Sequence, residues 1–558
     1  MNQSATILVS NPNKNVDQFH RIVVTILALC LAGGALFFIF EDQIHRFLIS
    51  YLPMGEGKTP AYYNDLFRVA AFELWWIAAT LVIALLFYRM PRLARGVNFI
   101  EEAMVLNPPR FIASITVAYA CIVLIVTFVV LEQFPNSSDE YVYLYQAQTL
   151  RDGKLWDPSH PIEKSFGFNH IAIKDGIMVG RFPPGWPLVI ALITAVGIPA
   201  SLVNPLLSIV AILVFHRLCL RKYGAEVAGW ATLMLAFTSF FIFNAASYFS
   251  HVLCVLATLL FVSAADRFAL HRRARHGLLA GVCLGIISTT RYYTAFLLFF
   301  PFLVVWLHMH GWKSFRFFLL VAIGAAPFFG LLLWYNYAIT GNPVEPVTMW
   351  GYKNEALGFV NGHTPLQGVE HILRRIAMFV YWCSPVLLAL YFVFLIRKIS
   401  RKASAVFAAE DYFFIALMVG YFFYYEIGGN QYGPRFYFEA FPFLVLFVVV
   451  KVFRENNFRA KVLIYATIVI ALVKLPVIAW RENRIVRERT DVYRIVEEKG
   501  IRNAVVLLSA GTGVLRPMPS GDLTRNDIHF KNRVLYAIDH PEANARLLEY
   551  YKDRSFYR

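Results

Sequence analysis

Long stretches of the chain carry almost no charge, and they constrain its fold more than any other feature. A helix needs about 20 apolar residues to cross the hydrocarbon core of a bilayer. The chain has 58% apolar and 16% charged residues, against about 25% charged in soluble domains, which excludes a soluble or a disordered protein. We predict a mainly α, polytopic membrane protein with about 13 transmembrane helices, near 21–40, 69–88, 111–131, 201–220, 225–245, 251–268, 277–290, 294–310, 316–335, 376–397, 411–427, 436–453 and 461–480.

Short clusters of lysine and arginine follow every second predicted span, as at Arg89, Arg92 and Arg95. The positive-inside rule assigns such clusters to the cytoplasm. The N-terminus is then cytoplasmic, and four larger segments lie outside: 41–68, 132–185, 336–375 and 481–558. The net charge of +16 is therefore mainly a topology signal and gives no argument for nucleic-acid binding.

Composition divides the chain into three parts, with boundaries near 110 and 480. Residues 1–110 hold a polar tail and two spans, 111–480 hold the main transmembrane region, and 481–558 have a soluble composition. All six cysteines lie in apolar spans without a CxxC pair, so no disulfide framework or zinc site is indicated. We predict a small α/β domain for the third part, with helices at 492–499 and 543–551 and strands at 504–509 and 534–538.

The outer loop 132–185 contains a predicted helix at 138–152. Ser137 followed by Glu140 is a capping-box pattern. Adjacent carboxylates on a helix point about 100° apart, so Asp139 and Glu140 do not both face one site. In one interpretation, Glu140 caps the helix and Asp139 only favours the helix dipole. In the other, the helix N-terminus keeps Asp139 ionised, and Asp139 acts as a general base at the membrane surface.

The same loop ends in a proline-rich run at 180–187, which rules out a straight helix there. Arg181 and Lys174 place positive charge on the outer side, against the general bias of the loops. Two interpretations remain: a solvated turn with ordinary basic residues, or a rigid cradle that presents cations to a lipid phosphate.

Several motifs resemble those of the GT-C glycosyltransferases, in the group related to protein O-mannosyltransferases and the lipid A aminoarabinose transferase. The resemblance covers roughly 111–558 and rests on the order and spacing of the motifs. They are the Asp139-Glu140 pair after an early span, Asp-Gly-Lys-Leu-Trp at 152–156, Arg-Phe-Pro-Pro-Gly-Trp-Pro at 181–187, the glycine-rich 281–291 ending in Thr-Arg, Gln-Tyr-Gly-Pro-Arg-Phe-Tyr at 431–437, and Asp-Leu-Thr-Arg-Asn at 522–526.

The resemblance implies an enzyme that uses a polyprenyl-phosphate-linked sugar as donor and works on the outer face of a bacterial cytoplasmic membrane. The acceptor is a lipid, a polysaccharide or a protein. Asp139 matches the family's first acidic residue, which would deprotonate the acceptor hydroxyl and so lead to inversion at the anomeric carbon. Glu140 matches the second acidic position, with three open roles: orienting the site, binding the acceptor, or capping the helix.

The leaving phosphate needs positive charge and hydrogen bonds. Arg435 is the first candidate for a donor phosphate ligand, followed by Arg291, Arg181 and Lys174. An arginine between two apolar half-spans, as Arg291 is, is costly unless it faces a polar cavity or snorkels to the interface.

Other outer residues give weaker signals. Tyr432, Asn430 and His251 are candidate sugar contacts, or simply members of the interfacial belt. Glu73 in the second span marks a polar contact inside the bundle or reaches the interface. Asp139 and Glu140 alone supply too few oxygens for a hard cation, so cofactor and metal use stay undecided.

Two other functions remain open. The number of spans and the interruption near Arg291 suit a secondary transporter or a lipid-linked sugar flippase, although we find no convincing internal repeat. An O-antigen ligase or polymerase would also use a lipid-linked saccharide outside, but with a pyrophosphate-linked donor.

Overall fold

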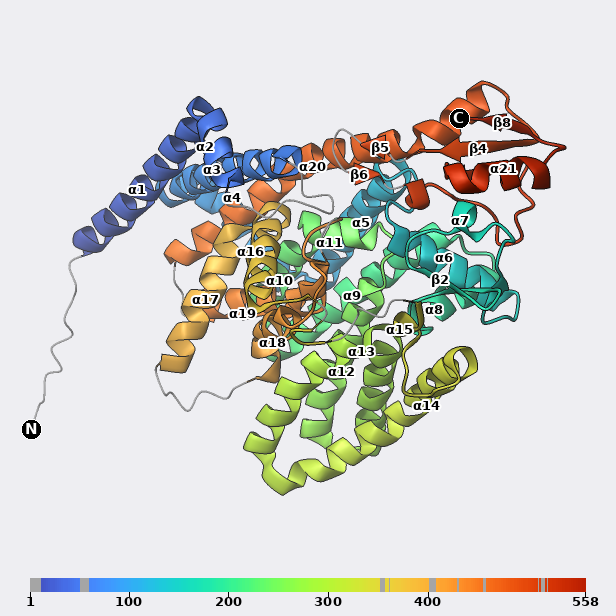
Figure 1. The fold of residues 1–558 in the computed structure, drawn as a ribbon. Helices are drawn as coiled ribbons and strands as arrows, with labels where there is room; N and C mark the ends of the chain where they lie inside the picture. The colour runs from blue at the N-terminus through green and yellow to red at the C-terminus, as the bar shows by residue number, and fades with distance from the viewer. Residues whose placement is uncertain are drawn as a thin grey trace, which may run out of the picture.

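The structure is a computed structural model that describes residues 12–50, 60–351, 357–360, 362–400, 408–428, 431–454, 458–509, 511–512, 517–518 and 520–558. The protein is 76% helical with small sheets, so the predicted mainly α class is confirmed (Figure 1). The helices are α1 (Pro12–Ile39), α2 (Glu41–Ile49), α3 (Pro60–Arg89), α4 (Pro91–Leu106), α5 (Pro108–Ile125), α6 (Ser138–Arg151), α7 (Glu163–Phe166), α8 (Gly185–Ala195), α9 (Ala200–Tyr223), α10 (Ala225–Ala236), α11 (Ser239–Ala245), α12 (His251–His271), α13 (Ala274–His310), α14 (Phe315–Thr340), α15 (Val347–Gly351), α16 (Pro365–Trp382), α17 (Pro385–Ser400), α18 (Phe413–Phe422), α19 (Phe441–Arg454), α20 (Phe458–Glu498) and α21 (Pro541–Tyr550).

Among the described residues, short π and 3-10 turns and eight short strands complete the elements. The turns are η1 (Val126–Val130), η2 (Gly311–Ser314), η3 (Ala409–Tyr412), η4 (Arg435–Ala440) and η5 (Ser520–Asp522). The strands are β1 (Asp157–Pro158), β2 (Ile171–Lys174), β3 (Ile177–Gly180), β4 (Ala504–Leu508), β5 (Gly511–Thr512), β6 (Pro517–Met518), β7 (Val534–Ile538) and β8 (Ser555–Tyr557).

Within the described residues, seven helical stretches are long and apolar enough to cross a membrane, or eight if the bent pair α10–α11 counts as one span. The protein is an integral membrane protein on this basis. The predicted number of 13 spans is not confirmed. One reason is that the stretch Ala274–Thr340 holds three of the predicted spans. Another is that α18 is only 10 residues long.

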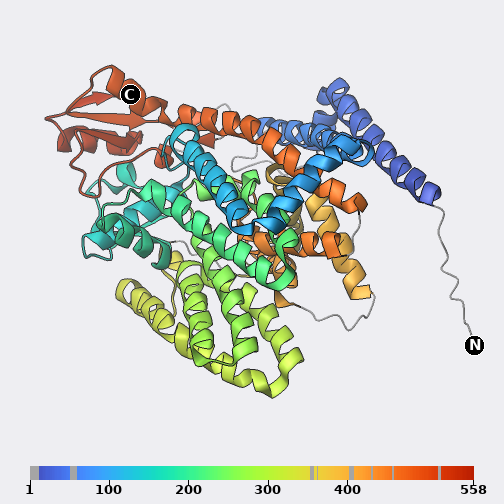
Figure 2. The same ribbon diagram turned by 180° about the vertical axis from the view of Figure 1, so that it is seen from behind.

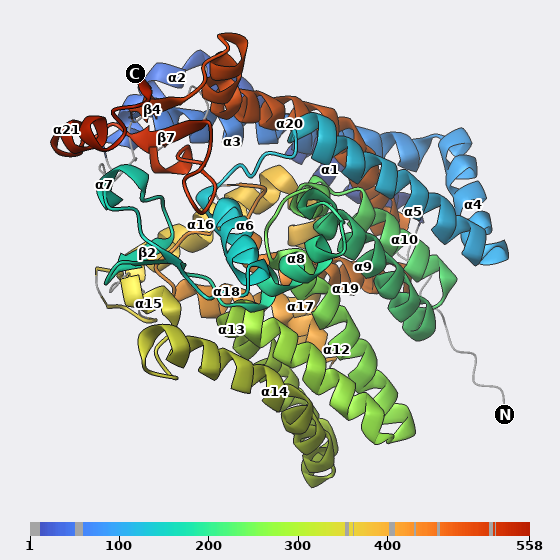
Figure 3. The same ribbon diagram turned by 90° about the vertical axis from the view of Figure 1, so that its right-hand side faces the viewer.

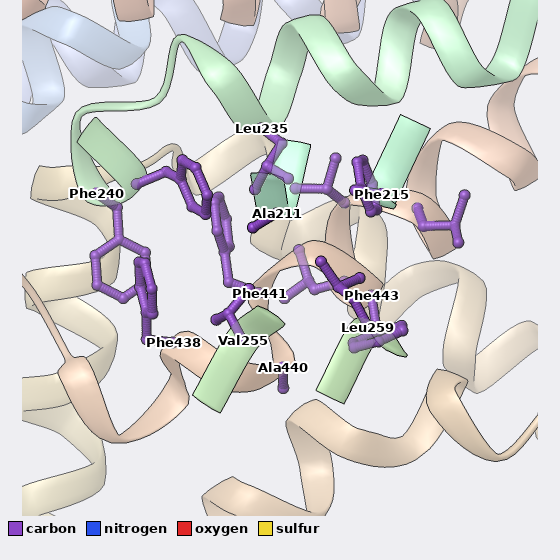
Figure 4. Close-up of a cluster of buried hydrophobic side chains, with 14 of the residues drawn as sticks. Ala211, Phe215, Leu235, Phe240, Val255, Leu259, Phe438, Ala440, Phe441 and Phe443 are labelled. Atoms are coloured by element: carbon purple, nitrogen blue, oxygen red, sulfur yellow. The ribbon is translucent and has the colours of Figure 1, made fainter. Parts of the chain in front are cut away.

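The hydrophobic core lies where α9, α10, α12 and α19 meet. Phe215 of α9, Leu235 of α10 and Leu259 of α12 are fully buried and lie near Phe441 of α19 (Figure 4). Interfaces between membrane helices gain stability mainly from close packing, because lipid tails are as apolar as the side chains. Tyr143 and Ala147 of the 132–185 loop belong to the same cluster of buried apolar side chains, so the loop is packed on this core.

Helices α13 and α14 pack closely because glycines face each other along both of them. A Cβ atom added at Gly281 would come within 2.3 Å of the Val321 carbonyl oxygen, and one added at Gly324 within 2.3 Å of the Leu278 carbonyl oxygen. Small residues allow two membrane helices to approach in this way. The three helices α12, α13 and α14 extend together from the rest of the bundle in Figures 1 and 2.

Helix α3 joins the main region through a buried ion pair. Lys474 Nζ of α20 lies 2.6 Å from Glu73 Oε1 of α3, and each side chain is only 6% exposed. The sequence left the environment of Glu73 open, and the structure shows a contact inside the bundle. Lys474 Nζ also lies 4.8 Å from the centre of the Tyr381 ring. The pair therefore attaches α3 to the main bundle.

Replacing Lys474 by Met is expected to lower the free energy of unfolding by about 2 kcal/mol, because Glu73 would stay buried without its charged partner. The double variant Glu73→Leu/Lys474→Met is expected to recover most of this loss, since a buried ion pair is often replaceable by apolar residues. Thermal unfolding in detergent measures both variants. A double variant no more stable than Lys474→Met would contradict the role of the pair.

The predicted C-terminal α/β domain is present. Its sheet has the strand order β7-β4-β8, and β4 pairs in parallel with both neighbours. Helix α20 differs from the prediction, because it runs unbroken through 480 and joins the predicted last span to the predicted helix at 492–499. The domain lies beside α6 and α7, far from α1 (Figures 1 and 3).

Candidate active site

Helix α6 carries the acidic residues Asp139 and Glu140 of the 132–185 loop and begins as the sequence predicts. Ser137 is the N-cap, and its hydroxyl oxygen accepts the backbone N–H of Glu140 at 3.3 Å. The predicted capping box is only half formed. The carboxylate of Glu140 accepts from the Ser137 hydroxyl and from the backbone N–H of Tyr248, at 3.2 and 3.0 Å. The Glu140 side chain therefore ties α6 to the segment before α12.

Asp139 is the centre of a charged cluster. Its Oδ1 lies 3.0 Å from His170 Nε2, and its Oδ2 accepts from Arg435 Nη1 and Nη2 at 3.3 and 3.2 Å. The Asp139 side chain remains 23% exposed. Burial alone would raise the pKa of Asp139, but the contact with His170 and the charges of Arg435 and Arg181 outweigh it and hold the pKa well below its usual range. Asp139 is therefore ionised and reachable.

Glu140 has the opposite electrostatic environment. It is 1% exposed, and burial raises the pKa of its carboxyl from 4.5 to about 7, against the Tyr248 N–H and the charge of Arg435. Two neighbouring carboxyls thus differ strongly in acidity. Asp139 suits a role that needs a carboxylate, whereas Glu140 exchanges a proton near neutral pH.

The raised pKa of Glu140 predicts a pH-dependent stability. The unfolded chain releases this proton near pH 4.5, whereas the folded chain keeps it up to about pH 7. The stability from this group is therefore present below pH 4.5 and is lost as the pH rises to about 7, by up to about 3 kcal/mol. We expect Glu140→Gln to weaken this pH dependence in thermal unfolding between pH 5 and 8.

The exposed Glu163 of the same loop supplies a matched control for this measurement. Glu163→Gln is expected to follow the wild-type pH dependence. Parallel curves for Glu140→Gln and wild type would show that Glu140 does not titrate in this range.

A second charged cluster lies beside the first. Glu439 Oε1 is 2.9 Å from His251 Nδ1 and 3.4 Å from Arg291 Nε, and Glu439 is fully buried. Arg291 interrupts α13 with φ −148° and ψ 74°. Its guanidinium also donates to Tyr421 and Thr294, both at 3.3 Å. The costly arginine between two half-spans therefore faces polar groups inside the protein.

Tyr143 and Ser250 lie between the two clusters. The Tyr143 hydroxyl is 3.3 Å from Ser250 Oγ, and Ser250 directly precedes His251. Burial raises the pKa of Tyr143 to about 12, with a further increase from Asp139 and a decrease from Arg291. The charge of Arg435 also lowers the pKa of Glu140, which shows that Arg435 lies near both acidic residues of α6. The candidate residues therefore form one connected polar region.

The remaining candidates occupy different surroundings. Arg181 is buried, and its charge acts on Asp139. Lys174 is exposed at the end of β2 and lies 5.2 Å from the Trp350 ring, and no contact within the described chain joins it to Asp139. Tyr432 is fully buried against Phe243 and Trp382. Asn430 lies outside the described residues.

Sequence patterns did not indicate His170 or Glu439. Glu439 is an acidic residue inside a long apolar run, which is the pattern that singled out Glu73. The sequence could therefore have identified Glu439 as a candidate. His170 has no such pattern, and its φ of +67° is visible only in the structure. In the described part of the chain, no group of three or more His, Cys, Asp or Glu side chains is arranged to hold a metal ion.

Comparisons with known proteins concern the fold. No protein-family model matches the sequence, and no curated protein matches it. The structure is similar to ArnT from Cupriavidus metallidurans bound to undecaprenyl phosphate, with 11% identity, a TM-score of 0.47, and coverage of 79% of this chain and 89% of that one. It is also similar to the Archaeoglobus fulgidus oligosaccharyltransferase in complex with zinc and sulfate, with 12% identity, a TM-score of 0.43, and coverage of 71% of this chain and 60% of that one. Both are GT-C fold glycosyltransferases, the superfamily whose motifs the sequence resembles.

Proposed function

We propose that the protein is a membrane glycosyltransferase that moves a monosaccharide from a polyprenyl-phosphate carrier to an acceptor hydroxyl on the outer face of the membrane. The observation that carries the proposal is the Asp139 carboxylate, ionised, partly exposed, and held between His170 and Arg435. A carboxylate in reach of a substrate hydroxyl can act as a general base. The charge distribution of the loops supports the outer location.

The reaction is a single displacement. Asp139 accepts the proton of the acceptor hydroxyl, whose oxygen forms a bond to the anomeric carbon as the bond from that carbon to the phosphate oxygen breaks. The electron pair of the broken bond stays on the lipid phosphate. One displacement inverts the anomeric centre.

Arg435 is suited to bind the leaving phosphate. Its guanidinium carbon lies 3.6 Å from the centre of the Phe249 ring, which orients the planar group. A phosphate can accept hydrogen bonds from the same two N–H groups of Arg435 that donate to Asp139 in this structure. Arg291 and Arg181 add positive charge to the same region, which favours a dianionic leaving group.

The test is sugar transfer by the purified full chain in proteoliposomes with polyprenyl-phosphate sugars and an envelope extract as acceptor. Mass spectrometry identifies the glycosylated acceptor and the released lipid. We expect a covalent product and lipid monophosphate. Release of lipid pyrophosphate would instead point to a ligase or polymerase, and movement of the donor across the bilayer without a covalent product would point to a flippase.

A further inference from the structure

One short segment of the C-terminal domain, Asp522–Asn526, contacts both sides of the Asp139 cluster. We call it the bracket segment. It comes nearly 400 residues after α6 in the chain, as the separation of 390 between Arg525 and its partner Pro135 shows. The domain that carries it lies beside α6 in Figures 1 and 3.

On one side, the bracket segment holds the residues that lead into α6. Arg525 Nη2 donates to the Pro135 carbonyl oxygen at 2.5 Å, and the Tyr141 hydroxyl donates to the Asn526 carbonyl oxygen at 2.9 Å. The Arg525 guanidinium lies 4.0 Å from the Phe134 ring centre and 5.0 Å from that of Tyr141. These contacts fix the turn just before and the turn just after Asp139.

A second arginine from the same part of the chain supports this turn. Arg489 Nη1 of α20 donates to the Asn136 carbonyl oxygen at 2.8 Å and lies 3.8 Å from Asp522 Oδ2. Arg489 is 3% exposed, so the carbonyl is held by a buried charge. A hydrogen bond to a charged donor is stronger than one between neutral groups.

On the other side, the bracket segment holds the residue next to His170. Asn169 Nδ2 donates to Asp522 Oδ1 at 2.8 Å. His170 has a φ of +67°, a conformation that a histidine keeps only when its surroundings hold it. The same segment therefore contacts residues that flank both partners of the Asp139–His170 contact.

The bracket segment is itself attached to the sheet of the C-terminal domain. Asn526 Nδ2 donates to the Tyr536 carbonyl oxygen, and Asn526 Oδ1 accepts the Tyr536 N–H, at 2.8 and 2.9 Å. The Tyr493 hydroxyl of α20 donates to the Leu523 carbonyl oxygen at 2.6 Å. The position of α6 is thus tied to β7 and α20.

We propose that Arg525 and Asp522 are positioning residues, through which the C-terminal domain sets the distance between Asp139 and His170. This inference rests on the proposed function for its catalytic consequence. A displacement of about 1 Å in a catalytic group costs on the order of a hundredfold in rate. The domain is then a working part of the active site rather than a separate cap.

The experiment compares Arg525→Ala, Arg525→Lys and wild type as full chains in proteoliposomes. We expect Arg525→Ala to lower kcat for sugar transfer by roughly tenfold to a hundredfold, with little change in KM for the donor. Arg525→Lys is expected to restore part of kcat, since it keeps the charge and one donor. Lys164→Ala is the control, because Lys164 also joins the loop to the domain, 2.8 Å from Glu542, in an exposed pair.

Hydrogen exchange of the first turn of α6 is a second readout that needs no substrate. Faster exchange in Arg525→Ala than in Lys164→Ala, together with the loss of kcat, supports the proposal. Unchanged exchange, or faster exchange with normal kcat, overturns it. A wild-type protein that transfers no sugar would refute the proposed function, and the exchange result would still show whether the bracket segment holds α6.

Discussion

Asp139→Asn is expected to lower kcat for sugar transfer by about 10²- to 10⁴-fold, which is the usual contribution of a general base. Asparagine has nearly the same shape, its single carbonyl oxygen can still accept from Arg435, and its amide N–H can donate to an unprotonated Nε2 of His170, so the geometry of the site is preserved. It has no carboxylate to take the acceptor proton. The measurement is single-turnover transfer in proteoliposomes at saturating donor.

The matched control is Asp175→Asn in the exposed turn between β2 and β3. Asp175 has a φ of +54°, a conformation that asparagine tolerates well. This variant is expected to keep wild-type activity. Near-normal transfer by Asp139→Asn, with a normal unfolding temperature, would remove Asp139 as the base.

Arg435→Gln is expected to lower kcat/KM for the donor by about 10²- to 10³-fold, or about 3 to 4 kcal/mol of transition-state stabilisation. Glutamine cannot offer two parallel charged donors to the leaving phosphate. Arg435→Lys keeps the charge without the paired geometry, so we expect it to recover only part of the loss. Initial rates over a range of donor concentrations separate kcat from KM.

Arg151 of α6 is exposed and provides the control for an arginine lost near the site. Arg151→Gln is expected to behave as wild type. The double variant Asp139→Asn/Arg435→Gln is expected to have only slightly lower transfer activity than the less active of the two single variants, because the two side chains act as a unit. Full additivity of the two losses would indicate that Asp139 and Arg435 act independently.

Local patterns predicted local structure well. The helix expected at 138–152 is α6, with Ser137 as its N-cap, and the strands expected at 504–509 and 534–538 are β4 and β7. These elements depend on nearby residues, namely a capping side chain and a short apolar run. The span count was less predictable, because kinks such as the one at Arg291 join or divide apolar stretches.

The sequence by itself determined that the protein is a helical membrane protein with a charged loop at 132–185, since charge density and the length of apolar runs depend only on which residues follow one another in the chain. Only the tertiary structure decided which charges meet. Arg435 reaches Asp139 across 296 residues, and Arg525 reaches Pro135 across 390. Capping was one of three roles left open for Glu140, and its carboxylate accepts the N–H of Tyr248 as well as the Ser137 hydroxyl. When helices pack, each buried polar group needs a hydrogen-bond partner, and that partner often comes from a distant part of the chain. A local sequence pattern does not show which distant residue this will be.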